Sequence, residues 1–328
     1  GLLMKTIRTT CPYCGVGCGV LASVDDAGRV SVRGDDQHPA NLGRLCVKGA
    51  ALGETTGLAG RLLAPEVDGQ KVTWSQALAE TASRLQQVID QHGPQAVAFY
   101  ASGQLLTEDY YAANKLMKGF IGAANIDTNS RLCMSSAVTG YKRAFGADVV
   151  PCSYEDVENS DLVVLVGSNA AWAHPVLYQR LAQAKRDNPR LQIVAIDPRR
   201  TATCEIADRH LALAPGSDGG LFVGLLNALA QAGACVDGFR DGAQALAEAS
   251  GWDVAKVADF CGLAADEVAG FYRDFIAAPR AITLYTMGIN QSASGSDKCN
   301  AIINVHLASG KYGRRGCGPF SLTGQPNA

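Results

Sequence analysis

Three cysteines lie within eight residues near the start of the chain, in the stretch TTCPYCGVGCGV. Two residues separate Cys11 from Cys14 and three separate Cys14 from Cys18, with a glycine after the second cysteine and on both sides of the third. A fourth cysteine, Cys46, follows in GRLCVKGA and completes the spacing C-x2-C-x3-C-x27-C. Glycine lets the backbone turn sharply and lets its amides approach sulfur, so these four thiolates can converge on one metal centre.

Two kinds of metal centre use cysteine in this way, the iron-sulfur cluster and structural zinc. Structural zinc is more often held by two well-separated C-x2-C pairs, whereas here three ligands lie in one tight loop. The spacing therefore favours a 4Fe-4S cluster and leaves zinc as the alternative.

The composition predicts a folded, globular protein. The chain has 328 residues, 47% of them hydrophobic and 18% charged, which is enough for two or three domains with a sizeable core. The formal net charge of -2 provides no basic field, so we expect no nucleic-acid partner. The start, GLLMKTIRTT, holds neither a long apolar run nor a twin-arginine pair, so we predict a cytoplasmic protein with no membrane partner.

Residues 1–58 are predicted to form a small module around the four cysteines. Between Cys18 and Cys46, the segment GVLASVDDAGRVSVRGD alternates apolar and polar residues around an Asp-Asp-Ala-Gly turn. This pattern indicates a β-hairpin.

Beyond this module, short apolar strands alternate with amphipathic helices. We predict strands in AVAFYASG, DLVVLVGSN, LQIVAIDPRR and ITLYTMGINQ, and helices at 107–120, at 176–186 and in DKCNAIINVHLASG. Such alternation is typical of βαβ units, so the predicted class is α/β, with doubly wound, Rossmann-like parallel sheets in αβα layers.

Polar or glycine-bearing segments follow these strands. In open α/β sheets the carboxyl ends of the strands form the ligand crevice, so the pattern indicates a nucleotide-like ligand as an alternative to plain turns. Neither G-x-G-x-x-G nor G-x-x-x-x-G-K-[ST] occurs. The segments are 103–104, 167–169, 197–201, 215–218 and 288–291.

A series of motifs runs through nearly the whole chain: CPYCGVGC, LCVKG, ASGQ, NIDTNSRLCMSSAVTGYKRAFGAD, LVGSNAAWAHP, IDPRRT, APGSD, MGINQS and GCGPFSLTGQPNA. In this order they resemble the molybdenum bis-molybdopterin guanine dinucleotide (bis-MGD) oxidoreductases. Within that family they are most similar to the catalytic subunits of assimilatory nitrate reductases. We predict a 4Fe-4S domain at 1–58, an incomplete first molybdopterin-binding αβα domain at 59–128 and 285–328, and an inserted dinucleotide-type αβα domain at 129–284.

The resemblance implies a role for each matching residue. It assigns Cys11, Cys14, Cys18 and Cys46 to the 4Fe-4S cluster, Lys48 to the path between cluster and pterin, and Cys133 to molybdenum. The cofactor would be Mo-bis(MGD). The residues that match positions along its dinucleotide arms are Gln104, Asn129, Gly167, Ser168, Asn169, Asp197, Thr201, Gly216, Ser217, Asp218, Met287 and Gln291.

The implied activity is reduction of nitrate to nitrite. Electrons would enter at the cluster from a reductase subunit or from a carrier of the ferredoxin or flavodoxin type. Formate dehydrogenase of the same family is the nearest alternative, but there histidine typically follows the metal ligand, whereas Met134 follows Cys133. A non-catalytic iron-sulfur electron-transfer subunit is the second alternative, and Cys133 with the intact pterin motifs argues against it.

The end of the chain also differs from the enzymes it resembles. The sequence stops at Ala328, in a segment with glycine and proline, whereas those enzymes continue for several hundred residues. We therefore expect the chain to be a fragment of a catalytic subunit.

Overall fold

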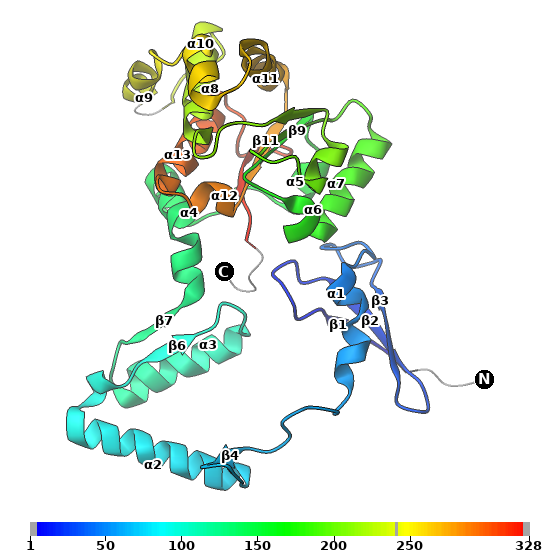
Figure 1. Cartoon of the computed structure of the whole chain (residues 1–328), viewed down its shortest axis with the longest axis vertical. Helices are drawn as coiled ribbons and strands as arrows, with labels where there is room; N and C mark the ends of the chain where they lie inside the picture. The colour runs from blue at the N-terminus through cyan, green and yellow to red at the C-terminus, as the bar shows by residue number, and fades with distance from the viewer. Residues whose placement is uncertain (1–4, 240–241, 324–328) are drawn as a thin grey trace. The chain divides into compact units, whose positions relative to one another are not determined.

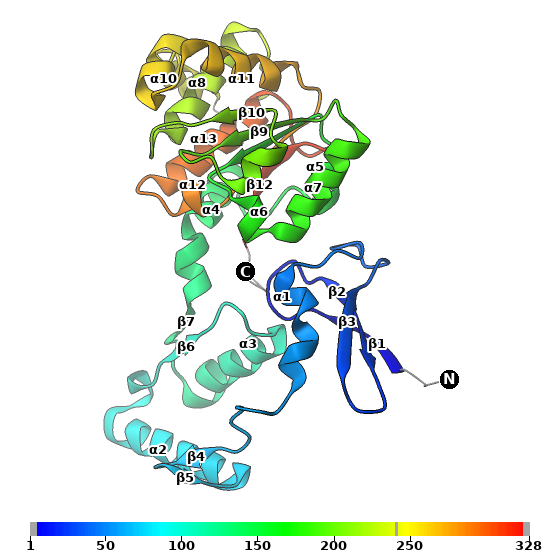
Figure 2. The ribbon, with the colours of Figure 1, turned by 45° about the vertical axis from the view of Figure 1, so that its right-hand side comes forward.

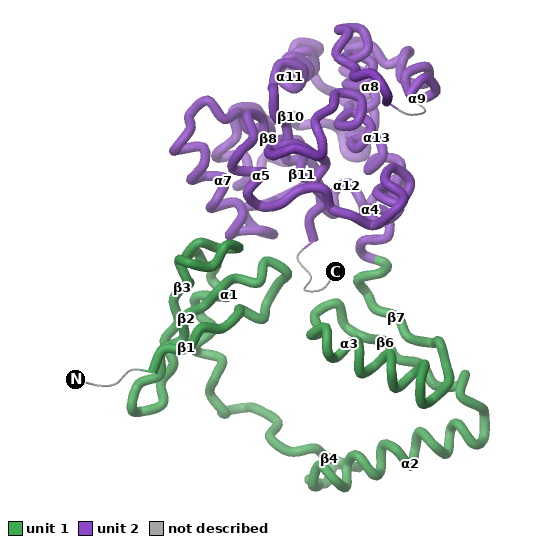
Figure 3. Tube along the Cα trace, turned by 180° about the vertical axis from the view of Figure 1, so that it is seen from behind, with its two compact units in different colours: residues 1–132, 325–328 green, residues 133–324 purple. Residues whose placement is uncertain are grey.

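The computed structural model describes residues 5–239 and 242–323, and the chain divides into two compact units. The first unit comprises residues 1–132 and 325–328, and the second comprises residues 133–324 (Figure 3). Among the described residues, no helix combines the length and the apolar character needed to cross a membrane.

The first unit begins with a three-stranded antiparallel sheet in the order β1-β2-β3, formed by β1 (Lys5–Thr10), β2 (Gly19–Val24) and β3 (Val30–Gly34) (Figure 1). The turn between β2 and β3 is held by Asp25, whose Oδ1 accepts hydrogen bonds from the backbone N–H of Ala27 at 3.0 Å and of Arg29 at 2.9 Å. Gly28 takes the left-handed conformation that this turn requires, with φ +75°. The predicted hairpin is confirmed.

The rest of the first unit is mainly helical, and it contains the helix predicted at 107–120 as α3 followed by the π-helix η3. Helix α2 begins with a capping box, in which Thr73 and Gln76 bond each other's backbone N–H groups. The elements are α1 (Val47–Ala50), η1 (Leu52–Thr56), β4 (Glu66–Val67), β5 (Gln70–Lys71), α2 (Trp74–His92), η2 (Pro94–Ala96), β6 (Phe99–Ala101), α3 (Thr107–Asn114), η3 (Lys115–Ile121) and β7 (Ile126–Thr128).

This helical part of the first unit has a small core. Its buried cluster centres on Val97, Met117 and Ala123. Large apolar side chains remain exposed nearby, with Tyr100 78% and Phe120 76% accessible to solvent. The segment therefore leaves several of its large apolar side chains exposed.

The second unit is built on a five-stranded sheet in which every pair of neighbours is parallel. In sequence order the strands are β8 (Leu162–Val166), β9 (Gln192–Ile196), β10 (Arg209–Leu211), β11 (Ala281–Tyr285) and β12 (Gly318–Ser321). Their spatial order is β10-β9-β8-β11-β12. The chain therefore adds β9 and β10 on one side of β8 and then adds β11 and β12 on the other side. This is the doubly wound order, and the predicted α/β class is confirmed.

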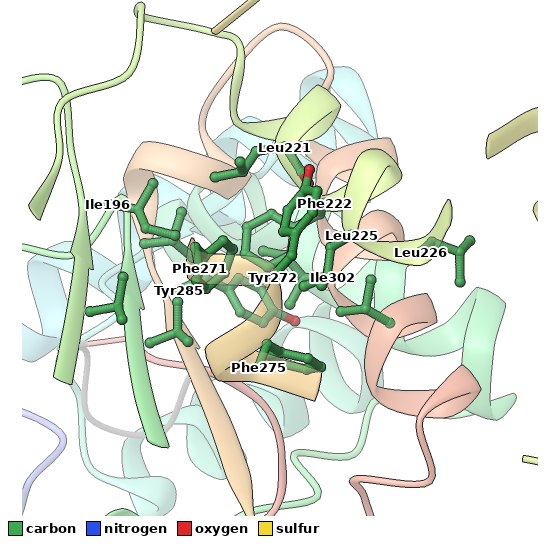
Figure 4. Packing of buried hydrophobic residues seen from close by; sticks show 14 of the residues in the cluster. Ile196, Leu221, Phe222, Leu225, Leu226, Phe271, Tyr272, Phe275, Tyr285 and Ile302 are labelled. Carbon is green, nitrogen blue, oxygen red and sulfur yellow. The ribbon is translucent and has the colours of Figure 1, made fainter. Parts of the chain in front are cut away.

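Helices cover both faces of this sheet (Figure 2). Alternate residues of β8 belong to different cores: Val164 lies in the buried cluster that contains Phe222 and Phe271, and Val163 lies in the cluster that contains Leu177. Figure 4 shows part of the first cluster, with Phe222 and Phe271 labelled. Burial on both faces explains why the strand is a continuous apolar run. The helices are α4 (Asn129–Phe145), α5 (Tyr154–Glu158), α6 (Ala170–Ala173), α7 (Pro175–Asp187), η4 (Ala202–Ile206), α8 (Asp218–Gln231), α9 (Gly242–Ala249), α10 (Val254–Cys261), α11 (Ala265–Ala277), α12 (Met287–Asn290) and α13 (Gly295–Ala308).

The predicted domain boundaries at 58, 128 and 284 stay a prediction. In this chain, residues 285–323 lie in the second unit, because β11 pairs with both β8 and β12. Residues 324–328, the end of the predicted first molybdopterin-binding domain, lie outside the described residues.

His306 is a fully buried titratable group of the second core. One ring nitrogen, Nδ1, lies 2.9 Å from the carbonyl oxygen of Lys311, and the other, Nε2, lies 2.8 Å from Thr283 Oγ1. Burial lowers the pKa of His306 from 6.5 to about 4, and the carbonyl contact opposes that shift only in part. The ring is therefore held neutral in the folded protein.

We expect this histidine to make the protein acid-sensitive. The folded pKa is below the unfolded one, so its contribution to stability is present above pH 6.5 and is lost as the pH falls toward 4. The unfolding free energy should decrease by about 3 kcal/mol over this window. In urea titrations at each pH, His306→Gln should flatten this decrease and the exposed control His92→Gln should not. Equal slopes in the wild type and His306→Gln would contradict the assignment.

Candidate functional site

The loop that carries the first three cysteines is closed by its own backbone. The N–H of Cys11 donates to the carbonyl of Cys18 at 2.9 Å, and the N–H of Gly17 donates to the carbonyl of Cys14 at 3.2 Å. Gly17 has φ +60°, which glycine adopts without strain. These bonds hold Cys11, Cys14 and Cys18 on one compact turn directly before β2.

A buried asparagine connects the fourth cysteine to this turn. Asn41 is completely buried, and its amide exchanges hydrogen bonds with the backbone of Gly19 at 2.8 and 3.0 Å and donates to the carbonyl of Arg44 at 2.8 Å. Cys46, two residues after Arg44, is the N-cap of α1. Within α1, a Cβ added to Gly49 would lie 3.8 Å from Cys11 Sγ, so this helix passes close to the first thiol.

The four thiols act on one another electrostatically. Burial is the main cause that raises the pKa of Cys11 and raises that of Cys18 to about 12, and nearby Cys14 and Cys46 raise both further. Among the described residues, no three His, Cys, Asp or Glu side chains are grouped to hold a single metal ion. In a cubane, each thiolate binds a different iron, so its ligands stand farther apart than those of one ion. The donor set fits such a cluster, and binding would deprotonate the thiols.

Two predicted cofactor residues of the first unit contact or flank this loop. Lys48 Nζ lies 5.9 Å from the centroid of the Tyr13 ring, and Gln104 Nε2 donates to the carbonyl of Tyr13 at 3.1 Å. Asn129 does not touch the loop, but its Oδ1 accepts from the N–H of Gly103 at 2.7 Å and thereby holds the segment that carries Gln104.

Cys133, the predicted molybdenum ligand, lies half-buried on α4. Its Sγ accepts a hydrogen bond from Gln291 Nε2 at 2.9 Å, and its carbonyl accepts from Asn290 Nδ2 at 3.2 Å. Residues on either side of the end of α12 thus hold both the sulfur and the backbone of Cys133. An N–H donor to sulfur suits a thiolate ligand, whose lone pairs accept such bonds.

A pocket of about 400 Å³ lies at the carboxyl ends of β8, β9 and β11. This is the point at which the strand order reverses, where doubly wound sheets bind their ligands. The lining residues are Val166, Gly167, Asn169, Ala173, Ile196, Asp197, Pro198, Leu213, Pro215, Gly216, Asp218, Thr286, Met287, Gly288 and Ile289.

Two glycines allow β8 and β11 to approach each other at the pocket. A Cβ on Gly167 would lie 2.9 Å from backbone atoms of Gly288, and Gly167 has φ +56°. The carbonyl of Gly167 accepts from the N–H of Gly288 at 3.1 Å and from Thr286 Oγ1 at 2.6 Å. A side chain at Gly167 would therefore both strain the backbone and separate the two strand ends.

Several polar atoms near these strand ends are buried without a hydrogen-bond partner. They include Ser168 Oγ, Thr201 Oγ1 and Asn290 Oδ1. Most buried polar groups in folded proteins are paired, so unpaired ones need an explanation. A polar ligand such as the sugar, phosphate or base of a dinucleotide would provide the partners.

The predicted dinucleotide residues fall into distinct groups. Six of them line the pocket: Gly167, Asn169, Asp197, Gly216, Asp218 and Met287. Ser168 and Ser217 are direct chain neighbours of these residues. Thr201 is the N-cap of η4 and does not line the pocket. Gln291 contacts Cys133 instead, and Gln104 and Asn129 belong to the first unit. Sequence reasoning missed the lining residue Thr286 and the lysine that pairs with Asp218, Lys298. The binding roles of these residues stay predictions.

The comparisons with known proteins agree with this geometry. The chain is 82% identical over 325 residues to a nitrate reductase of Klebsiella oxytoca and 38% identical over 348 residues to a periplasmic nitrate reductase of Desulfovibrio desulfuricans. These alignments cover 99% of this chain, but the chain spans only 38% and 45% of the two proteins. The solved structure of acetylene hydratase from Pelobacter acetylenicus shares the fold, with a TM-score of 0.79 at 21% identity over 93% of this chain and 43% of that one.

Two family models account for nearly the whole sequence. Residues 4–56 match the molybdopterin oxidoreductase Fe4S4 domain, and residues 61–328 match molybdopterin oxidoreductase. The first match agrees with the cysteine loop and the second with the doubly wound sheet and its crevice. A 4Fe-4S cluster and a molybdopterin are therefore the cofactors of this fold, and the chain belongs to the molybdopterin oxidoreductase family.

Proposed function

We propose that this chain is the amino-terminal part of a nitrate reductase catalytic subunit. The observation that carries the proposal is the 82% identity to a nitrate reductase across 99% of the chain. Since the chain spans only 38% of that protein, the activity is proposed for a longer subunit that contains this chain.

The proposal gives each part of the site a task. Cys11, Cys14, Cys18 and Cys46 would hold the 4Fe-4S cluster, with Lys48 beside it on the path of the electrons. Cys133 would bind molybdenum through its sulfur, and the pocket at the strand ends would receive a guanosine arm of the bis(MGD) cofactor.

When bound to Cys133, the molybdenum group would supply oxygen-atom transfer, and the overall reaction would convert nitrate, two electrons and two protons to nitrite and water. The chain's own residues prepare this chemistry. Gln291 holds the sulfur of Cys133 at 2.9 Å, and Asn290 fixes the backbone behind it. A metal ligand fixed from both sides keeps its geometry through a change of oxidation state.

Met134 supports nitrate over formate as the substrate. The formate dehydrogenases that the sequence resembles typically carry histidine after the metal ligand, and Met134 cannot move protons as an imidazole can. Its sulfur instead lies 3.9 Å from Asn290 Nδ2. A non-catalytic electron-transfer subunit would not need a metal ligand, so that alternative does not explain why Gln291 and Asn290 hold Cys133 in position.

The compartment, the donor and the assimilatory role are part of the same proposal. We propose a cytoplasmic, assimilatory enzyme that receives electrons from a reductase subunit or from a carrier of the ferredoxin or flavodoxin type. One relative is a periplasmic enzyme, so fractionation of cells that express the full-length protein distinguishes the two compartments.

An assay of the full-length protein tests the activity. Purified protein is offered nitrate with reduced viologen and, in parallel, formate with oxidised viologen. We expect nitrite to form from nitrate and no viologen reduction with formate. Formate oxidation without nitrate reduction would establish the alternative instead.

A further inference from the structure

A buried ion pair lies behind the wall of the pocket. Lys298 Nζ on α13 donates to Asp218 Oδ1 at 3.0 Å and lies 2.9 Å from Oδ2. The two side chains are only 9% and 8% exposed. Asp218 begins α8 and lines the pocket, whereas Lys298 is not among the lining residues.

The pair leaves part of the carboxylate available to a ligand. Lys298 Nζ lies close to both carboxylate oxygens, but an ionised carboxylate has about four lone-pair sites, so the oxygens can accept further hydrogen bonds. A buried carboxylate requires compensation of its charge, and an ammonium group behind it provides that without occupying the pocket. Asp218 is thus fixed in position while its carboxylate keeps lone pairs that can accept from a ligand.

The chemistry of the pocket favours a ligand with N–H donors. Its two acidic residues, Asp197 and Asp218, are acceptors when ionised and repel phosphate. Apolar groups from Val166, Ile196 and Leu213 form much of the remaining wall, as suits a flat base. Guanine presents N1–H and a 2-amino group side by side, which a carboxylate can accept together.

We propose that Lys298 is a positioning residue that orients Asp218 and thereby sets the preference of this pocket for guanine over hypoxanthine. The inference rests on the proposed function, in which the pocket takes a guanosine arm. Hypoxanthine differs from guanine only by lacking the 2-amino group, so it measures the contribution of that one donor. A hydrogen bond to a charged group predicts a preference of about 10- to 100-fold.

The experiment compares GDP with inosine diphosphate as equilibrium ligands of the cofactor-free 328-residue chain. We expect the wild type to bind GDP about 10- to 100-fold more tightly. In Lys298→Met the carboxylate loses its fixed orientation, so the preference should fall to within about threefold. Lys298→Arg keeps a charged donor and should retain most of the preference.

A purely structural role would give a different result. Lys311 is a comparable buried lysine, 6% exposed, but it donates to the carbonyls of Phe275 and Ile276 at the end of α11. We expect Lys311→Met to lower stability without changing the ratio of the two affinities. A ratio that falls equally in both variants, or that stays unchanged in Lys298→Met, would overturn the inference. If Lys298→Met does not fold, Lys298→Gln replaces it, because its amide can donate but carries no charge.

The wild-type measurement separates this inference from the proposed function. Wild-type chain that binds neither nucleotide, or binds both equally, would overturn the guanosine assignment of the pocket and this inference with it. A wild-type preference for GDP that survives the loss of Lys298 would overturn only the role of Lys298.

Discussion

In the full-length protein, Cys133→Ser is expected to lower nitrate reduction by more than about 100-fold. Loss of a residue that only hydrogen-bonds to a metal ligand typically costs 10- to 100-fold in metal affinity or activity, and Cys133 is proposed as the ligand itself. Serine keeps the size of the side chain but replaces a soft thiolate by a hard, weakly acidic hydroxyl. The iron content should remain at the wild-type level, because the cluster cysteines are unchanged.

Cys235→Ser is the matched control for this variant. Cys235 is also a half-buried free thiol of the second unit, but it packs against the hydrophobic core and does not line the pocket. We expect near wild-type activity from it. Full activity in Cys133→Ser, or the same loss in both variants, would show that the molybdenum ligand is misassigned.

Cys18→Ala should remove the iron-sulfur cluster. Cys18 is 5% exposed, and its carbonyl closes the cysteine loop. Alanine has no sulfur, so one of the four irons would lose its protein ligand. Iron should fall from about four atoms per chain toward the background, and the visible absorbance of the cluster should disappear. Nitrate reduction should be lost with it, because electrons are proposed to enter there.

A buried cysteine outside the loop is the control. Cys204 is 3% exposed and belongs to η4 in the second unit, so Cys204→Ala removes a buried thiol without touching the loop. It should retain iron and absorbance. Retention of a full complement of iron in Cys18→Ala would contradict the proposed ligand set.

Local patterns made much of the fold predictable. The hairpin after Cys18 follows from strict alternation and an Asp-Gly-containing turn, and β8 and β9 follow from short apolar runs between polar segments. Helices α7 and α13 begin and end close to where the sequence places them. These elements depend mainly on residues near in sequence.

The segment between β10 and β11 was not predicted in detail. It holds α8, α9, α10 and α11, and α8 is buried on most of its circumference, so its sequence lacks the polar face that reveals an amphipathic helix. Its packing depends on partners far along the chain, such as Phe271 against Phe222.

In the candidate site, too, features set by nearby residues were predictable, and contacts between residues far apart in the sequence were not. Cysteine spacing and the polar strand ends are local signals, so the cluster loop and the segments that hold five of the six predicted pocket residues could be identified from the sequence pattern. Met287, and the role of each single residue, came from the family resemblance. The bonds of Gln291 to Cys133 and of Lys298 to Asp218 join residues 158 and 80 positions apart. No local pattern encodes such distances, and only the fold brings these groups together.

The most direct test of the central claim is the cofactor content of anaerobically purified full-length protein. Iron, labile sulfide, molybdenum, zinc and the guanosine monophosphate released by acid hydrolysis are measured on one preparation. We expect about four iron and four sulfide per chain, together with molybdenum and a twofold molar excess of guanosine monophosphate over molybdenum. Stoichiometric zinc without labile sulfide, or a preparation free of guanosine monophosphate, would contradict the claim that this protein holds a 4Fe-4S cluster and a molybdenum bis(MGD) cofactor.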